Sequence, residues 1–235
     1  MIYHNIDDII ASYDIKTDSV LTKIWPQYAQ KIWERIEHYG DDINHYGQDT
    51  LAPHLTRISE DSRDFLSYLG HKDNVVNNFY DAIKISDLGK THEAFDINIW
   101  KLPNSPTQEQ RIEKRQHTQR GLEVLADVLK DAPQELLCHP HLQTVIPIHM
   151  VYHHTPFKEN KEMGIMMEVA CIVDSFDGDM DTKKITHGSG NSRTPQEQYD
   201  RMLANNPNDK YHGGFRESLV HDYFDFRVKQ RGMTL

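Results

Sequence analysis

Apolar residues recur along this sequence at steps of three and four, and this spacing constrains the fold more than any other feature. Within residues 1–45 the apolar residues at these steps are Ile24, Tyr28, Ile32, Ile36 and Tyr39. Such residues share one face of a helix with 3.6 residues per turn. A half-buried strand would instead alternate apolar and polar residues, and no stretch of useful length does so. The sequence therefore predicts an all-α fold.

Caps and helix breakers divide the chain into successive segments. Beyond the N-terminal piece, we expect helices over residues 51–69, 74–85, 107–129, 141–154 and 161–177, and a last pair between 195 and 229. Gly70 ends the first of these, and Thr107 with Gln110 three residues later is typical of a capping box. Residues 179–194 are rich in Gly, Ser, Thr and Asp and predict a surface loop. We divide the chain into an N-terminal helical extension (1–45) and a main helical domain (46–235).

Composition narrows the classes of partner and compartment. Acidic residues outnumber basic ones 36 to 26 in 235 residues, which argues against a binder of duplex nucleic acid. The two cysteines, Cys138 and Cys171, are too few and too far apart for a disulfide framework or a thiolate zinc site, so we expect two inert core thiols and a reducing setting. The N-terminus does not resemble a signal peptide, and no stretch is apolar enough to cross a bilayer. We expect a cytoplasmic protein with no membrane partner.

Several polar residues lie at predicted helix ends or in helix middles, where a purely structural domain seldom places them. They are His54, Asp87, His117, the adjacent pair His153 and His154, and Asp174. Imidazoles and carboxylates suit zinc, iron or manganese, and a carboxylate can also bridge two ions, a role for which Asp87 is placed. Adjacent helical residues point about 100° apart. The histidine pair can therefore reach one ion only near a helix end, and the following Thr155-Pro156 predicts such an end.

The chain has fifteen histidines, so a structural explanation of any one of them stays open. A histidine taken singly is more often a surface residue or a hydrogen-bonded core residue than a ligand. We expect solvated side chains for the histidines in loops or on polar faces: His139, His141, His187, His212 and His221. His149, one helical turn before His153, is expected to lie outside the ligand pocket.

Several motifs follow one another in a familiar order. They are SDLGKTHEAFDINIWKLPNSPTQEQRIEKRQHTQRGLEVL (86–125), VYHHTPF, VACIVDSFDGD and the tail SRTPQEQYDRMLANNPNDKYHGGFRESLV. They resemble the HD-GYP branch of the HD superfamily of metal-dependent phosphohydrolases. Its corresponding motifs are His-Asp-Ile-Gly-Lys, a histidine four residues before a glycine, a histidine pair and Val-Ala-Asp-x-Phe-Asp-Ala. The resemblance covers roughly residues 51–220.

This resemblance implies an HD-domain bundle of about five core helices around a metal centre. One ion would be held by Asp87, His117, His153 and His154, and a second by His54, Asp87, Asp174 and the first histidine of the His-Asp pair. Ser86 replaces that histidine here. A hydroxyl is a weak ligand, so the second ion should bind poorly or be absent unless water or a nearby group such as His92 compensates. Thr50 stands where some members have a glutamate, so no third ion is expected.

The substrate is less defined by the resemblance. The family's Glu-Arg-x-x-Gly-x-Gly-Tyr-Pro loop is replaced by the shorter segment 155–160, which weakens a claim to cyclic di-GMP. Lys90 matches a family lysine thought to contact a substrate phosphate, although a solvated cation at a helix end explains Lys90 equally well. Arg193 could add a second positive group from the predicted loop.

Two functions are therefore carried forward. The first is a metal-dependent phosphohydrolase that uses metal-activated water, a phosphodiesterase in its narrower form, acting on a nucleotide or cyclic (di)nucleotide with Asp87 and Lys90 as catalytic residues. The alternative is a catalytically silent HD-type domain that binds a nucleotide or a protein partner in signalling. Either function implies one or two divalent ions from the set Fe, Mn, Zn and Mg. The extension 1–45 should pack on the bundle or on a second chain, as in a homodimer.

Overall fold

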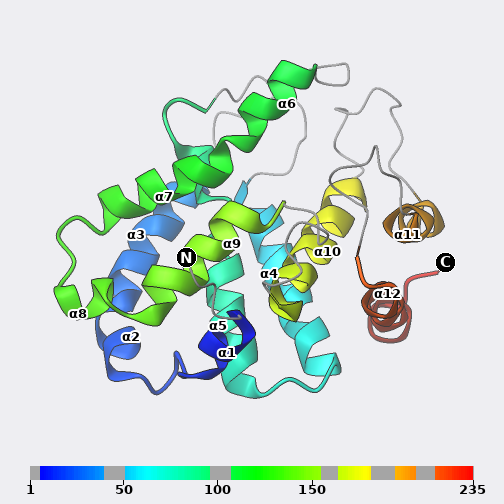
Figure 1. The fold of residues 1–235 in the computed structure, drawn as a ribbon, viewed down its shortest axis with the longest axis horizontal. Coiled ribbons are helices and arrows are strands. Elements are labelled where there is room, and N and C mark those ends of the chain that lie inside the picture. The colour runs from blue at the N-terminus through cyan, green and yellow to red at the C-terminus, as the bar shows by residue number, and fades with distance from the viewer. Residues whose placement is uncertain are drawn as a thin grey trace.

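The computed structural model describes residues 6–39, 51–95, 107–154, 164–180, 194–204 and 215–234, and these residues form helices and turns without a strand. The prediction of an all-α fold is confirmed (Figure 1). The helices are α1 (Ile6–Ala11), α2 (Ser19–Lys23), α3 (Trp25–His38), α4 (Leu51–Tyr68), α5 (Asp73–Ile83), α6 (Gln108–Arg115), α7 (His117–Val128), α8 (Gln134–Leu137), α9 (Ile146–Tyr152), α10 (Ile165–Met180), α11 (Pro195–Leu203) and α12 (Glu217–Arg231). Two short segments join them, the 3-10 helix η2 (Leu88–Thr91) and the π-helix η4 (His141–Val145). No helix in these ranges is long and apolar enough to cross a membrane.

One hydrophobic core joins the N-terminal helices to the rest of the bundle. The predicted apolar face of α3 is confirmed, because Tyr28, Ile32 and Ile36 are buried while Ile24 and Tyr39 pack partly buried against the same core. In Figure 1 α11 and α12 are seen nearly end-on beside α10 and α4, and α12 adds aromatic side chains to the core. The division of the chain at residue 45 stays a prediction.

The helix predicted over residues 107–129 is in fact two helices. The capping box is confirmed, since the Thr107 side chain accepts a hydrogen bond from the backbone N–H of Gln110. The first helix ends at Arg115, and the Gln116 N–H turns back to the carbonyl of Glu113 in a tighter turn. His117 therefore begins α7 instead of lying in the middle of one long helix. Farther along, α10 reaches Met180, so the predicted loop cannot begin at 179, and residues 181–193 lie outside the described residues.

Two predictions about solvated histidines are wrong. His141 is fully buried, and both ring nitrogens have partners there. The Tyr13 hydroxyl donates to its Nδ1 at 2.6 Å, and its own Nε2–H donates to Asp81 at 2.8 Å. The His139 side chain is only 10% exposed and lies 3.4 Å from Asp18. The prediction holds for the exposed His221, while His187 and His212 lie outside the described residues.

The two cysteines also differ from each other. Cys171 is buried, as predicted, but Cys138 is exposed at the end of the short helix α8, so the prediction of a core thiol is wrong there. A helix of only four residues has little apolar surface to bury, and its C-terminal end faces solvent.

Polar side chains tie the N-terminal segment to the bundle. The Asn78 amide on α5 accepts the N–H of Ile15 at 2.8 Å and donates to the carbonyls of Ile10 and Tyr13 at 2.8 Å. The Asp7 carboxylate on α1 accepts hydrogen bonds from the backbone N–H groups of Ile165 and Met166, at 2.8 and 3.1 Å. These two N–H groups lie at the start of α10, where the helix itself offers no acceptor. These bonds satisfy groups that burial would otherwise leave unpaired.

We expect Asn78→Ala to lower the free energy of unfolding by about 3 kcal/mol, because the Ile15 N–H and the Ile10 carbonyl lose this partner and the Tyr13 carbonyl keeps only Asn74. Asn74→Ala is the matched control, since the Asn74 amide also reaches the Tyr13 carbonyl, at 3.0 Å, from a more exposed position. The control should cost about 1 kcal/mol or less. Urea denaturation measures both, and equal losses in the two variants would contradict this account.

Glu168 on α10 should make stability depend on pH. Burial raises its pKa to about 7, although the Arg216 guanidinium 3.2 Å away opposes the rise. The unfolded side chain releases its proton near 4.5, so between these values the folded state holds more protons and unfolding becomes easier as pH rises. From pH 5 to 7.5, wild type should lose on the order of 2 kcal/mol relative to Glu168→Gln. The control Glu217→Gln retains Glu168, so its stability should fall with pH in parallel with wild type. Parallel curves for wild type and Glu168→Gln in urea denaturation would refute the assignment.

Candidate metal centre

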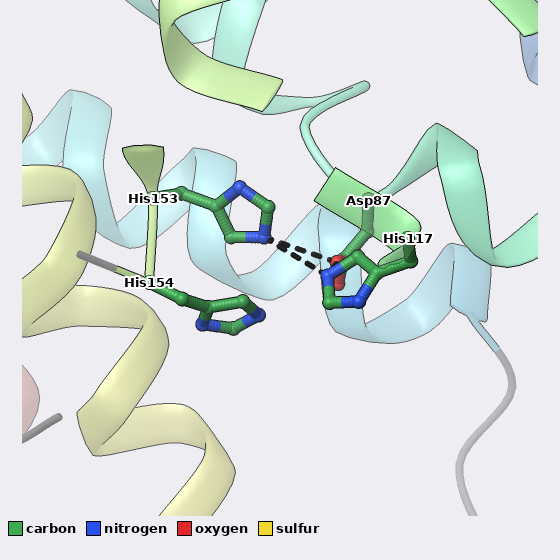
Figure 2. Close-up of side chains that lie close together, drawn as sticks. All are labelled: Asp87, His117, His153 and His154. Atoms are coloured by element: carbon green, nitrogen blue, oxygen red, sulfur yellow. Dashed lines mark hydrogen bonds and ion pairs between the residues drawn. The ribbon is translucent and has the colours of Figure 1, made fainter. Parts of the chain in front are cut away.

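Four predicted ligand residues converge in the middle of the bundle. One ligand atom from each of Asp87, His117, His153 and His154 lies within 4.8 Å of the others. Figure 2 shows the four side chains pointing toward one another from three separate segments. The first three are buried and His154 is partly exposed, so the group lies at the edge of the core with one side toward solvent.

A close backbone contact brings Asp87 next to His117. Asp87 precedes η2, and η2 packs on the first turn of α7 at Gly89. A Cβ on Gly89 would lie 1.8 Å from the His117 carbonyl oxygen and 2.5 Å from the Gly121 nitrogen. Only glycine permits this approach. The break before His117 matters for the same reason, since it places the imidazole in the first turn of α7, which faces η2.

The histidine pair lies where helix geometry allows both rings to face one point. Helix α9 ends at Tyr152, and His153 is its C-cap. The two rings are 4.1 Å apart between centroids and tilted by 45°. This agrees with the expectation that adjacent histidines converge only near a helix end, although Pro156 itself lies outside the described residues.

Hydrogen bonds to backbone carbonyls fix the tautomers of two rings. The Nδ1 of His117 bonds to the Lys114 carbonyl, and the Nδ1 of His153 bonds to the His149 carbonyl at 2.8 Å. A carbonyl only accepts, so each Nδ1 carries a proton, and each ring presents a lone pair at Nε2 when it is neutral. Metal-binding histidines are commonly held in this way by a carbonyl behind the ring.

These lone pairs face a carboxylate oxygen and each other. Asp87 Oδ1 lies 3.0 Å from Nε2 of His117 and 3.2 Å from Nε2 of His153, and the two nitrogens are 3.4 Å apart. Three electron-pair donors at this spacing repel one another unless a positive charge lies among them. A proton can join only two of the three, whereas a metal ion accepts from all.

The surroundings hold His117, His154 and Asp87 in the protonation states that bind metals, whereas for His153 the lowering of the pKa by burial is outweighed by Asp87 and Asp174, which raise it. Burial lowers the pKa of His117 to about 4, against the pull of Asp87. Burial and the neighbouring His153 hold the pKa of His154 well below its ordinary value. Burial alone would raise the pKa of Asp87, but Lys90 and the surrounding imidazoles hold it well below the ordinary value. A neutral imidazole and an ionised carboxylate are the forms that donate to a metal.

A second ligand group shares Asp87 with the first. The Nε2 of His54 on α4 lies 3.4 Å from Asp87 Oδ2 and 3.2 Å from Asp174 Oδ1 on α10. The other oxygen of Asp174 lies 3.1 Å from Nδ1 of His154. The structure thus brings together all six predicted ligand residues, with Asp87 in the bridging position, and their role in binding metal stays a prediction.

Sequence reasoning missed the two residues that orient His54. Asp177 accepts from the His54 Nδ1 at 2.8 Å and from the Arg57 guanidinium at 2.7 and 3.0 Å. Burial of His54 would lower its pKa, but the carboxylates of Asp174, Asp177 and Asp87 raise it to about 10. A usable signal was present, because Arg57 and Asp177 each follow a predicted ligand by three residues and so share its helix face.

The remaining predicted residues have mixed outcomes. Lys90 is 5% exposed and its ammonium is bonded to Asp87, so the alternative of a solvated helix-end cation is wrong, and the substrate contact stays a prediction. Ser86 is buried and its hydroxyl has no hydrogen-bond partner in the described structure. His92 lies 3.2 Å from Glu123, and His149 packs on Phe79; neither belongs to a ligand group. Arg193, Thr50 and the segment 155–160 lie outside the described residues.

Comparisons of the chain with protein-family models, with curated proteins and with solved structures find no match. The resemblance to the HD superfamily therefore stays a prediction from the motifs. The geometry of the buried cluster is an independent observation, and it shows a group of histidines and aspartates at metal-ligand spacing.

We expect Gly89→Ala to damage both the fold and the cluster. The added methyl group meets backbone atoms that cannot rotate away, so the free energy of unfolding should fall by about 3 kcal/mol or more and metal affinity at least about tenfold. Gly121→Ala tests the same interface with a milder contact, because its nearest neighbour is the flexible Met150 Sδ at 3.4 Å. The control should lose about 1 kcal/mol or less. Thermal melting and metal titration measure both effects, and equal behaviour of the two variants would contradict the close-contact argument.

Proposed function

We propose that this protein is a metal-dependent phosphohydrolase that binds a divalent ion through Asp87, His117, His153 and His154. One observation carries the metal-binding part of the proposal. Two buried imidazoles, each with its Nδ1 bonded to a backbone carbonyl, direct their Nε2 lone pairs at one carboxylate oxygen. In the absence of a cation this arrangement is repulsive, and a metal ion makes each contact favourable.

The ligand types narrow the choice of ion. Three imidazoles and one carboxylate suit iron, manganese or zinc, whereas magnesium prefers oxygen ligands and retains much of its water. We therefore favour iron, manganese or zinc over magnesium. Among the described residues His154 is partly exposed, so the centre meets solvent on that side, and a catalytic site requires such access while a closed structural site does not.

The reaction follows from what such a centre supplies. A bound divalent ion lowers the pKa of a water molecule to about 7 and polarises a phosphoryl oxygen. Asp87 and the imidazoles would hold the ion, and Asp174 orients His154 from the second group. Lys90 adds a fixed positive charge beside Asp87, which favours the charge that develops on a phosphoryl group. The choice of a phosphoester, and of a nucleotide or cyclic nucleotide in particular, is supported by the motif resemblance alone.

One observation favours the second candidate, a catalytically silent domain that binds a nucleotide or a protein partner. Ser86 stands where the resembling family has a ligand histidine, and its buried hydroxyl makes no hydrogen bond in the described structure. A centre short of one ligand can retain an ion and a binding surface after its chemistry is lost.

Metal analysis and a rate assay separate these functions. Protein purified without a metal-chelating tag and supplied with iron or manganese should contain about one ion per chain, and Asp87→Ala or His117→Ala should contain less than about half an ion. The same variants should hydrolyse a generic phosphodiester at least about a hundredfold more slowly. His221→Ala, at an exposed histidine, should change neither value.

Each outcome has a distinct meaning. A wild-type metal content below about half an ion, unchanged in Asp87→Ala, would reject the metal centre. Metal that depends on Asp87 without any turnover on phosphodiesters or nucleotides would select the silent domain instead of the enzyme.

A further inference from the structure

The two oxygens of Asp87 face different surroundings. Oδ1 lies against the Nε2 atoms of His117 and His153, at 3.0 and 3.2 Å. Oδ2 contacts the Lys90 ammonium and lies 3.4 Å from the Nε2 of His54. One edge of the carboxylate therefore belongs to the first ligand group, and the other edge is already bonded to a positive charge.

Lys90 is held in this position by its own segment. Its backbone N–H donates to the Asp87 carbonyl at 2.9 Å in the turn that begins η2, and the neighbouring Gly89 packs against the α7 backbone. The side chain is 6% exposed and the Asp87 side chain is fully buried. A second lysine–aspartate pair with the same spacing, Lys130 with Asp127, is 67% and 63% exposed with its atoms 3.4 Å apart. The spacing alone therefore does not bury the ammonium; the packing of η2 on α7 does.

The second ligand group offers an ion few protein ligands, and one of them is already in contact with the Lys90 ammonium. It consists of His54, Asp87 and Asp174, and the further histidine that the motif resemblance would supply is Ser86 in this chain. An ion in this group would need a deprotonated Nε2 on His54 and also Asp87 Oδ2, the oxygen that Lys90 contacts. Two cations in contact with one carboxylate oxygen in a buried site repel strongly, and the ammonium is tethered there by the chain.

We propose that the Lys90 ammonium takes the place of a second metal ion at Asp87 Oδ2, so that the centre holds a single ion. The inference deepens the proposed function and depends on it, because it assumes an ion in the first group. Lys90 is thereby assigned as a positioning residue. Its charge neutralises Asp87 Oδ2 and leaves Oδ1 to the metal. The loss of the second ion is likewise assigned to Lys90 and not to Ser86 alone.

Manganese binding to three variants and wild type tests this inference. Equilibrium dialysis gives the number of ions per chain, and electron paramagnetic resonance distinguishes an isolated Mn²⁺ from a coupled pair. Wild type and Lys130→Met should each bind about one ion with an uncoupled signal, because Lys130 forms an exposed pair of the same spacing. Lys90→Met keeps a long unbranched side chain but removes its charge, so this variant should bind about two ions with a coupled signal. Ser86→His should still bind about one, since the ammonium is retained.

The outcomes separate the two proposals. No Mn²⁺ in wild type rejects the proposed function, and the inference with it. One ion in both wild type and Lys90→Met rejects the inference and leaves the proposed function standing, as does a coupled pair in wild type. If Lys90→Met does not fold, wild type and Ser86→His decide the question: about two ions in Ser86→His would overturn the role of Lys90, and about one would support it.

Discussion

The buried carboxylate of Asp87 is the constraint on which the arrangement of this bundle depends. It is fully buried, and an ionised carboxylate without partners in such a place would cost several kcal/mol. Its partners come from its own turn through Lys90, from α7 through His117, from α9 through His153 and from α4 through His54. Each of these segments must therefore pack at a fixed distance from the turn that carries Asp87, which links the packing of the core to the geometry of the site.

The second ligand group, with His54 and Asp174, depends on contacts between α4 and α10. Helices α4 and α10 face each other through His54 and Arg57 on one side and Asp174 and Asp177 on the other. The start of α10 is in turn capped by Asp7, a residue of the N-terminal segment. Asp7 thus helps to fix the position of α10 along its own axis, and with it the position of Asp174.

The sequence was sufficient for features that local pattern controls, and insufficient for those that packing controls. The helical period, the cap at Thr107 and the ligand residue types could all be read directly. The break before His117 could not, because neither glycine nor proline marks Gln116, and the turn serves the contact between η2 and α7. Burial of His141 was missed for a similar reason: its partners Tyr13 and Asp81 are remote in sequence. Lys90 was left open between two interpretations, since only packing shows that its ammonium is enclosed.

The charge of the cluster bears on the proposed function, which requires an acidic chain to bind an anion. The carboxylates of Asp87, Asp174 and Asp177 are balanced within the structure by Lys90, Arg57 and the imidazolium that the raised pKa of His54 maintains. The cluster is then close to neutral, while the chain as a whole carries a formal charge of -10. A divalent ion held by neutral imidazoles would add its full charge to this balanced set. In the proposed function the ion would then be the attractive centre for a phosphoester on a chain of negative net charge, and binding of ion and anion should be coupled.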